Sequence, residues 1–291
     1  MKVIPTSQLL VNDKGAIYHL GLRPDQLADN VILVGDPKRV ETVSSFFEKI
    51  EYKVSNREMV THTGYFNGER ISVLSTGMGT DNLDIVVNEL DALVNIDLKK
   101  RVPKEKHHAL NLVRLGTSGA LQPDIAVGDF VASRFAVGLD GLLYFYEKYI
   151  EVLDRQMTDR FIKHMNYPKN LPCPYVVASS DTLFEKLSEG CHHGITATSP
   201  GFYGPQGRVL RLALAHESIN HDIETFAYDN WKVCNFEMES SALFGLGRML
   251  GHNTLTICVA IANRVTEQFL DDYHPQVKLL IQQTLERLTA K

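Results

Sequence analysis

The segment Val31-Ile32-Leu33-Val34-Gly35-Asp36-Pro37-Lys38-Arg39 contains a complete structural unit. Its four leading apolar residues, most of them β-branched, predict a short buried strand. Gly35 and Asp36 end that strand, and Pro37 suits the first turn of a helix, where the N–H that proline lacks would have no partner. A strand that leads through a tight turn into a helix is typical of α/β proteins.

Apolar runs of the same kind alternate with amphipathic segments over the rest of the chain. This alternation predicts an α/β fold with a buried, largely parallel sheet. Several runs end in glycine or a small polar residue, and ligands of open α/β sheets gather outside those carboxyl ends. The predicted strands are 31–34, 71–74, 112–115, 129–132, 175–178 and 255–260, and the predicted helices are about 38–47, 81–95, 158–165, 240–249 and 274–290.

Two segments are predicted to be insertions. Residues 97–108 carry Lys99-Lys100-Arg101 and Lys104-Glu105-Lys106, which is typical of a solvated surface loop. Residues 184–200 are rich in Gly, Ser, Thr and His, so we expect an irregular stretch there. Such a stretch either covers a pocket or is an idle surface loop.

The composition excludes several classes of protein. The 291 residues have a net charge of -5, whereas a surface that follows nucleic-acid phosphates shows a cationic excess. No stretch approaches the roughly 20 apolar residues that span a bilayer. The cysteines form no CxxC pair, so neither a zinc site nor a disulfide framework is expected. We therefore expect a cytoplasmic protein with reduced thiols at Cys173, Cys191, Cys234 and Cys258.

Three glycine turns follow predicted strands. The turn from Gly35 to Arg39 places backbone N–H groups and a guanidinium where an anion can sit, although a plain strand-to-helix turn has the same sequence features. Residues 114–120, Arg114-Leu115-Gly116-Thr117-Ser118-Gly119-Ala120, repeat the pattern. Arg114 needs a counter-charge because an unpaired buried guanidinium costs several kcal/mol, and a phosphate would supply one. Residues 75–80 lack a P-loop lysine, which argues against a nucleoside triphosphate site.

Two carboxylates lie close together in Asn235-Phe236-Glu237-Met238-Glu239-Ser240. On an extended chain Glu237 and Glu239 point the same way, and ionised carboxylates accept hydrogen bonds from the vicinal hydroxyls of a sugar. The alternative is that both residues open the helix that starts near Ser240, where acidic side chains favour the positive end of the dipole.

Together these stretches resemble the nucleoside phosphorylase family, and within it the uridine phosphorylase branch most. The resemblance covers about residues 18 to 264 and implies one domain over 1–291, a three-layer αβα sandwich around a mixed, partly barrel-like sheet. The matching stretches are 19–22 (HLGL), 34–41 (VGDPKRVE), 56–58 (NRE), 75–79 (STGMG), 114–120 (RLGTSGA), 179–181 (SSD), 202–208 (FYGPQGR) and 235–240 (NFEMES).

The resemblance also implies roles for individual residues. Phosphate would be held by Gly35, Arg39, Arg114 and Thr117, and by Arg57 from the neighbouring subunit of a homodimer or larger homo-oligomer. Ribose would be contacted by Glu237, Met238 and Glu239, and by His19 from the partner, although such a histidine taken alone is more often a surface residue. The base would be bound by Phe202, Gln206, Arg208 and Ile261. The catalytic residues would be Arg114, Glu239 and Arg208.

The base-binding pair suits uracil on chemical grounds. Uracil presents an acceptor, a donor and an acceptor along one edge, which a glutamine amide and a guanidinium complement. Taken alone, Gln206-Gly207-Arg208 would simply be a solvated loop. The purine-specific relatives have an aspartate after the last core strand, whereas this chain has Ile261-Ala262-Asn263-Arg264, which favours pyrimidines. Arg264 would support the base through water.

The resemblance implies phosphorolysis of a pyrimidine ribonucleoside, with no required cofactor. Some family members hold a monovalent cation between subunits, for which Glu58, Ile71 and Ser75 would be the ligands, with K+ as the ion. The alternatives are a nucleosidase of the same fold that uses water, a purine nucleoside phosphorylase, and a nucleoside-binding protein without turnover. A nucleosidase has no reason to gather Arg39, Arg57 and Arg114. A dinucleotide-binding fold lacks support because Gly77-Met78-Gly79 has no third glycine.

Overall fold

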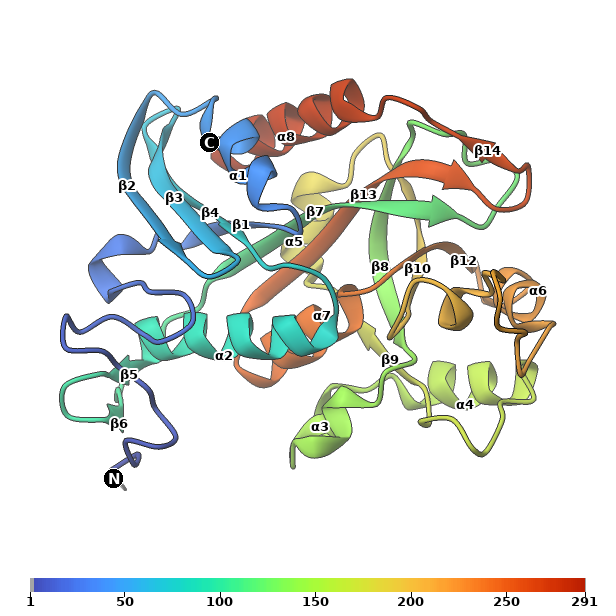
Figure 1. Ribbon diagram of the computed structural model, residues 1–291, viewed down its shortest axis with the longest axis horizontal. Helices are drawn as coiled ribbons and strands as arrows, with labels where there is room; N and C mark the ends of the chain where they lie inside the picture. The colour runs from blue at the N-terminus through green and yellow to red at the C-terminus, as the bar shows by residue number, and fades with distance from the viewer. Residues whose placement is uncertain (1–2, 291) are drawn as a thin grey trace.

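The computed structural model describes residues 3–290 as a 12-stranded mixed sheet flanked by helices, with a separate two-stranded sheet (Figure 1). The helices are α1 (Pro37–Ser44), α2 (Thr80–Asn95), α3 (Tyr149–Val152), α4 (Arg155–His164), α5 (Asp181–Leu187), α6 (Ile219–Glu224), α7 (Ser240–Met249) and α8 (His274–Thr289). The strands are β1 (Asn30–Val34), β2 (Lys49–Asn56), β3 (Met59–Phe66), β4 (Glu69–Ser75), β5 (Ile96–Asp97), β6 (Val102–Pro103), β7 (Asn111–Ala120), β8 (Phe130–Gly138), β9 (Tyr175–Ala178), β10 (His192–Thr198), β11 (Ala227–Tyr228), β12 (Trp231–Glu237), β13 (Asn253–Asn263) and β14 (Gln268–Phe269).

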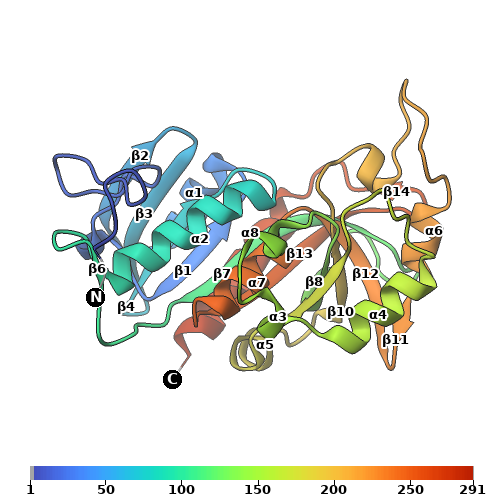
Figure 2. The same cartoon turned by 90° about the horizontal axis from the view of Figure 1, so that it is seen from below.

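Helices cover both faces of the sheet, which gives three layers. β1 shows why: Val31 and Leu33 pack with α2 and α7, whereas Ile32 and Val34 pack with α1 and α8. Because side chains alternate along a strand, a run that is apolar at every position must be buried on both faces. Figure 2 looks at the face that α2 and α7 cover.

Part of the sheet closes into a ring. Its order is β11-β12-β10-β8-β13-β7-β1-β4-β3-β2, and β12 additionally pairs with β7. The extra pairing joins Asn235 to Ala120 and Phe236 to Gly119 in antiparallel register. Strands β12, β10, β8, β13 and β7 therefore form a closed, barrel-like unit, as expected, and Glu237 ends β12 at its rim.

The predicted strands and helices all exist, with ends that differ by a few residues. The prediction for residues 184–200 was wrong, because Phe184 belongs to α5 and residues 192–198 form β10 in the middle of the ring. Its small polar residues are buried there: Thr196 and Thr198 hydrogen-bond to side chains of β12, so polarity did not indicate exposure. Residues 97–108 are largely exposed, as predicted, and include the short β5–β6 hairpin.

No helix within residues 3–290 combines the length and apolar character needed to cross a membrane.

Candidate active site

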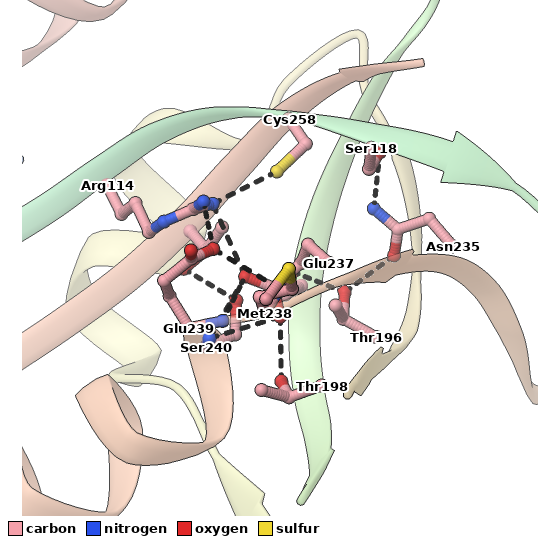
Figure 3. Close-up of polar contacts among 12 residues, drawn as sticks. Arg114, Ser118, Thr196, Thr198, Asn235, Glu237, Met238, Glu239, Ser240 and Cys258 are labelled. Carbon is pink, nitrogen blue, oxygen red and sulfur yellow. Dashed lines mark hydrogen bonds and ion pairs between the residues drawn. The ribbon is translucent and has the colours of Figure 1, made fainter. Parts of the chain in front are cut away.

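The centre of the site is a buried arginine that faces two buried glutamates (Figure 3). Arg114 on β7 places Nη1 3.3 Å from Glu237 Oε2, and its Nη2 donates to Glu239. All three side chains are no more than 6% exposed. The protein's own carboxylates therefore supply a counter-charge to Arg114, and phosphate binding at Arg114 stays a prediction. These carboxylates outweigh the effect of burial and raise the pKa of Arg114 above its ordinary value.

A glycine makes room for this guanidinium. A Cβ on Gly116 would collide with Arg114 Nη1 and would lie 2.9 Å from Cys258 Sγ. Cys258 on β13 accepts a hydrogen bond from Arg114 Nη1 at 3.4 Å. Burial raises the pKa of the Cys258 thiol to about 12, so the thiol is neutral and leaves the charge of Arg114 to the glutamates.

Glu237 holds the start of α7. Its carboxylate accepts from the backbone N–H groups of Glu239 and Ser240, each at 3.0 Å, and from the Thr198 hydroxyl at 2.7 Å. Thr198 in turn accepts from the backbone N–H of Ser241 at 3.0 Å. The helix-opening role that the sequence offered is therefore present, the contact with Arg114 was not predicted, and ribose binding stays a prediction. Thr198 was missed because it lies in the segment predicted to be irregular.

Glu239 joins two of the glycine turns. Its carboxylate accepts from the Gly79 N–H at 2.9 Å and from the Met238 N–H at 3.2 Å, as well as from Arg114. Burial raises the pKa of Glu239 above 4.5, Arg114 opposes this shift, and Glu237 adds to it. Met238 is half-buried between the two glutamates.

A second arginine lies beside this cluster without a carboxylate of its own. Arg39, half-buried in the first turn of α1, donates through Nη1 to the Leu115 carbonyl at 3.3 Å, and within residues 3–290 it forms no salt bridge. Burial and the charge of Arg114 both lower its pKa. Gly35, four residues before Arg39, approaches the turn that contains Gly77. A Cβ on Gly35 would lie 3.3 Å from the Gly77 carbonyl. Thr117 is half-buried on β7 opposite Val259. An anion near Arg39 would relieve this uncompensated charge.

The predicted base-binding residues form a compact turn. Gln206 ends the short helical turn Gly204–Gln206 and is 3% exposed. Arg208 Nη1 donates to Gln206 Oε1 at 2.6 Å and to the Phe202 carbonyl at 2.7 Å. The guanidinium also lies 3.7 Å from the centre of the Phe202 ring. Burial and the neighbouring Arg264 lower the pKa of Arg208 to about 10.

Main-chain contacts connect this turn to the glutamates. Ser199, which precedes the turn, donates its N–H to the Glu237 carbonyl at 2.9 Å. Arg264, which follows β13, packs over Gly119, the partner of Phe236 in β12. Ile261 is half-buried on β13. The turn therefore lies at the rim of the ring where Glu237 ends β12.

His19 and Arg57 lie together on a separate surface. Arg57 donates to the Tyr18 hydroxyl at 3.1 Å, and His19 Nδ1 lies 2.6 Å from Glu89 Oε1. Glu89 also accepts from the backbone N–H groups of His19 and Leu20. Within one protomer, neither His19 nor Arg57 contacts the Arg114 cluster. Glu89 was missed because it lies inside α2, where nothing in the sequence distinguishes it from an ordinary surface glutamate.

The three predicted cation ligands do not form one set within the protomer. Ser75 Oγ donates to the Glu58 carbonyl and accepts from the Val60 N–H, both at 2.8 Å. Ile71 lies four residues earlier on the extended strand β4, about 13 Å away at ~3.3 Å per residue. The resemblance places such a cation between subunits, so cation binding by Glu58, Ile71 and Ser75 stays a prediction.

The site can bring an anion to a substrate that carries hydroxyls and a planar ring. Three features lie at the carboxyl ends of strands in this αβα fold, where such folds bind ligands. They are the buried acceptors of Glu239, the uncompensated cation of Arg39, and the donors and acceptors of Gln206. Orienting two reactants in this way is what a group-transferring enzyme requires of its site.

The chain belongs to the Phosphorylase superfamily, which residues 29–289 match. It is 31% identical over 263 residues to a uridine phosphorylase of Thermococcus kodakarensis, covering 88% of this chain and 81% of that protein. It is 28% identical over 255 residues to a DeoD-type purine nucleoside phosphorylase of Oceanobacillus iheyensis, covering 85% of this chain and 88% of that protein. A Trypanosoma brucei nucleoside phosphorylase that shows uridine phosphorylase activity has a TM-score of 0.88 and 27% identity, covering 98% of this chain and 100% of that one.

Proposed function

We propose that this chain is a uridine phosphorylase, which converts uridine and inorganic phosphate to uracil and ribose 1-phosphate. The proposal rests on a difference between two neighbouring arginines, Arg114 and Arg39. Arg114 is satisfied by Glu237 and Glu239, whereas Arg39 beside it has no carboxylate within salt-bridge distance in residues 3–290. Phosphate is an anion that would complete this arrangement and act as the nucleophile.

In the proposed reaction, the glycosidic C1′–N1 bond breaks with its electron pair going to the base. A phosphate oxygen then bonds to C1′ of the positively charged sugar. Arg39 and Arg114, with Gly35 and Thr117 near them, would hold phosphate in line with C1′, which lowers the entropic cost of the encounter. Glu239 and Met238 would fix the ribose, with Glu239 accepting from its hydroxyls.

The leaving uracil carries negative charge, and the Gln206–Arg208 turn would stabilise it. A preformed donor that faces developing charge needs no reorganisation during the reaction. Phe202 would pack against the ring or the sugar, and Ile261 would line the base site. The absence of a carboxylate at Asn263 and Arg264 favours pyrimidines over purines. A purine nucleoside is the alternative substrate, because the chain is also similar to the purine nucleoside phosphorylase of Oceanobacillus iheyensis.

The complete site would need a second copy of the chain. Within one protomer the contacts of His19 and Arg57 are with Glu89 and Tyr18, away from the Arg114 cluster, and the exposed position of Arg57 supports a role in the site of a partner in a homodimer or larger assembly. We expect this assembly to act in the cytoplasm in nucleoside salvage and catabolism, with K+ near Glu58 as an optional component.

The deciding experiment measures uridine cleavage with and without inorganic phosphate, and ribose 1-phosphate as the product. We expect cleavage only with phosphate, and a preference for uridine over inosine. Equal rates with and without phosphate would indicate a nucleosidase, and a preference for inosine would indicate a purine nucleoside phosphorylase. Binding of uridine and phosphate without any product would indicate a protein that lacks turnover.

A further inference from the structure

Three hydrogen bonds form a closed set behind the base-binding turn. Asn220, in the first turn of α6, donates through Nδ2 to the Gln206 carbonyl at 3.0 Å when its carboxamide nitrogen faces that oxygen. Arg264 donates through Nη1 to the same carbonyl at 3.1 Å and through Nη2 to Asn220 Oδ1 at 3.1 Å. One carboxamide therefore satisfies a carbonyl and a guanidinium at the same time.

The turn is shaped around Asn220. Gly207 has φ 65°, a left-handed conformation that glycine adopts without strain. A Cβ on Gly207 would collide with the Asn220 carboxamide. The close approach of Asn220 therefore determines where Gln206 and Arg208, on either side of Gly207, project.

Asn220 is also neutral, which matters beside two guanidinium groups. Arg264 and Arg208 are close enough that Arg264 lowers the pKa of Arg208. A carboxylate at position 220 would hold Arg264 equally well but would cancel positive charge next to the base. A carboxamide orients Arg264 and leaves the positive potential in place for an anionic leaving group.

We propose that Asn220 is a positioning residue for base recognition, which fixes the Gln206 carbonyl and the Arg264 guanidinium so that the Gln206 side chain faces a pyrimidine. The proposal rests on the proposed function, because it assumes that Gln206 reads the base. Asn220 itself touches no substrate and acts only through Gln206 and Arg264.

The test compares Asn220→Ala, Asn220→Asp and the control His221→Ala, which changes an exposed neighbour on the same helix. Steady-state kinetics give the KM for uridine, the KM for phosphate and the kcat/KM ratio of uridine to inosine. We expect Asn220→Ala to raise the uridine KM about tenfold and to lower the uridine-to-inosine ratio, because a lost hydrogen bond of this kind is worth about 1 kcal/mol or more. The phosphate KM should stay within about twofold.

Asn220→Asp tests the importance of a neutral side chain. It keeps the acceptor for Arg264, but it loses the donor to the Gln206 carbonyl, as Asn220→Ala does, and adds a negative charge, so we expect kcat for uridine to fall more than in Asn220→Ala. His221→Ala should match the wild type in every constant. Thermal unfolding of each variant shows whether it is folded, and the Asp variant carries the test if the Ala variant is not.

Two results overturn the proposal in distinguishable ways. If the wild type prefers uridine but Asn220→Ala keeps the uridine KM and the uridine-to-inosine ratio, Asn220 has no positioning role while the proposed function stands. If the wild type itself does not cleave uridine with phosphate, the proposed function fails and this inference falls with it.

Discussion

Arg114 Nη1 lies 3.3 Å from Glu237 Oε2, and Nη2 of the same guanidinium donates to Glu239. One cation is thus shared by two buried anions, whereas Arg39 beside them forms no salt bridge within residues 3–290. These charges interact with one another. The effect of removing one of them on stability and activity therefore differs from one residue to the next.

We expect Arg114→Met to destabilise the protein and to abolish phosphorolysis. Removing one partner of a buried ion pair leaves an uncompensated charge and costs about 3–5 kcal/mol. Glu237 and Glu239 would both lose their cation. Urea unfolding measures the stability and a phosphate-dependent uridine assay measures the activity. Full stability in this variant would mean that the glutamates are not ionised beside Arg114.

The stability loss of Arg114→Met should depend on pH. Burial already raises the pKa of Glu239, and Arg114 opposes that shift, so the pKa rises further without Arg114. A carboxyl with a raised pKa keeps its proton in the folded state, and its penalty appears only as pH rises through that pKa. The loss of stability should therefore be smaller near pH 5 than near pH 8, as urea unfolding at about these two values would show. The opposite order would contradict the raised pKa.

Gly116→Ala should disturb the site without touching a substrate. The added methyl would collide with Arg114 Nη1, so the guanidinium must move away from Glu239. A misplacement of about 1 Å can cost about a hundredfold in rate, and we expect a loss of that order in kcat/KM. Gly119→Ala on the same strand is the matched control, because its Cβ would meet Arg264 Cγ at an ordinary 3.7 Å. Equal effects of the two substitutions would refute a specific role for Gly116.

Arg39→Gln should weaken phosphate binding while sparing stability. Hydrogen bonds to charged groups contribute about 1.5–3 kcal/mol, which corresponds to roughly a ten- to hundredfold higher KM for phosphate. The uridine KM should change little, and the free energy of unfolding should stay the same or rise, because Arg39 has no carboxylate partner to leave behind. Lys38→Gln, an exposed neighbour, is the control. A normal phosphate KM in Arg39→Gln would show that phosphate binds elsewhere.

Gln206→Ala should reduce pyrimidine selection more than ribose binding. Loss of the carboxamide removes the donor and acceptor that would face the uracil edge in the proposed complex, and it also frees Arg208 Nη1. Kinetics with uridine, thymidine, deoxyuridine and inosine measure the change. If the variant discriminates uridine from inosine as the wild type does, Gln206 does not read the base.

Glu89→Ala should impair recognition of the sugar through His19. Glu89 accepts from His19 Nδ1 and from two backbone N–H groups, so its loss frees both the ring and the segment that carries it. We expect the advantage of uridine over 5′-deoxyuridine in kcat/KM to shrink by about tenfold, the equivalent of one hydrogen bond. A general loss of stability would lower kcat/KM for both substrates equally. Such a uniform loss would contradict a role at the 5′ end.

The sequence predicted the fold where strands were buried on both faces. Residues 31–34 are apolar throughout and residues 255–260 are apolar except at Thr256, so each run fits few structures other than a buried strand. It failed for β10, whose Thr196 and Thr198 are polar but buried, because their partners come from β12 across the ring. A single segment does not show which distant strand will satisfy its hydroxyls.

The same limit applies to the site. The need of Arg114 for a counter-charge followed from its place in an apolar strand. Its partner Glu239 could not be identified, because it lies 125 residues away in the sequence. Glu89, Thr198 and Asn220 were not expected because each acts through another residue and carries no motif.

The antiparallel contact between β12 and β7 makes the site dependent on closure of the ring. Segments around residues 119 and 236 must meet before the ring closes, and only then does Glu237 reach Arg114. Contacts between such distant segments form slowly because a long loop must close first. A refolding chain should thus recover secondary structure well before it recovers turnover. A molecule whose ring has not closed would be inactive.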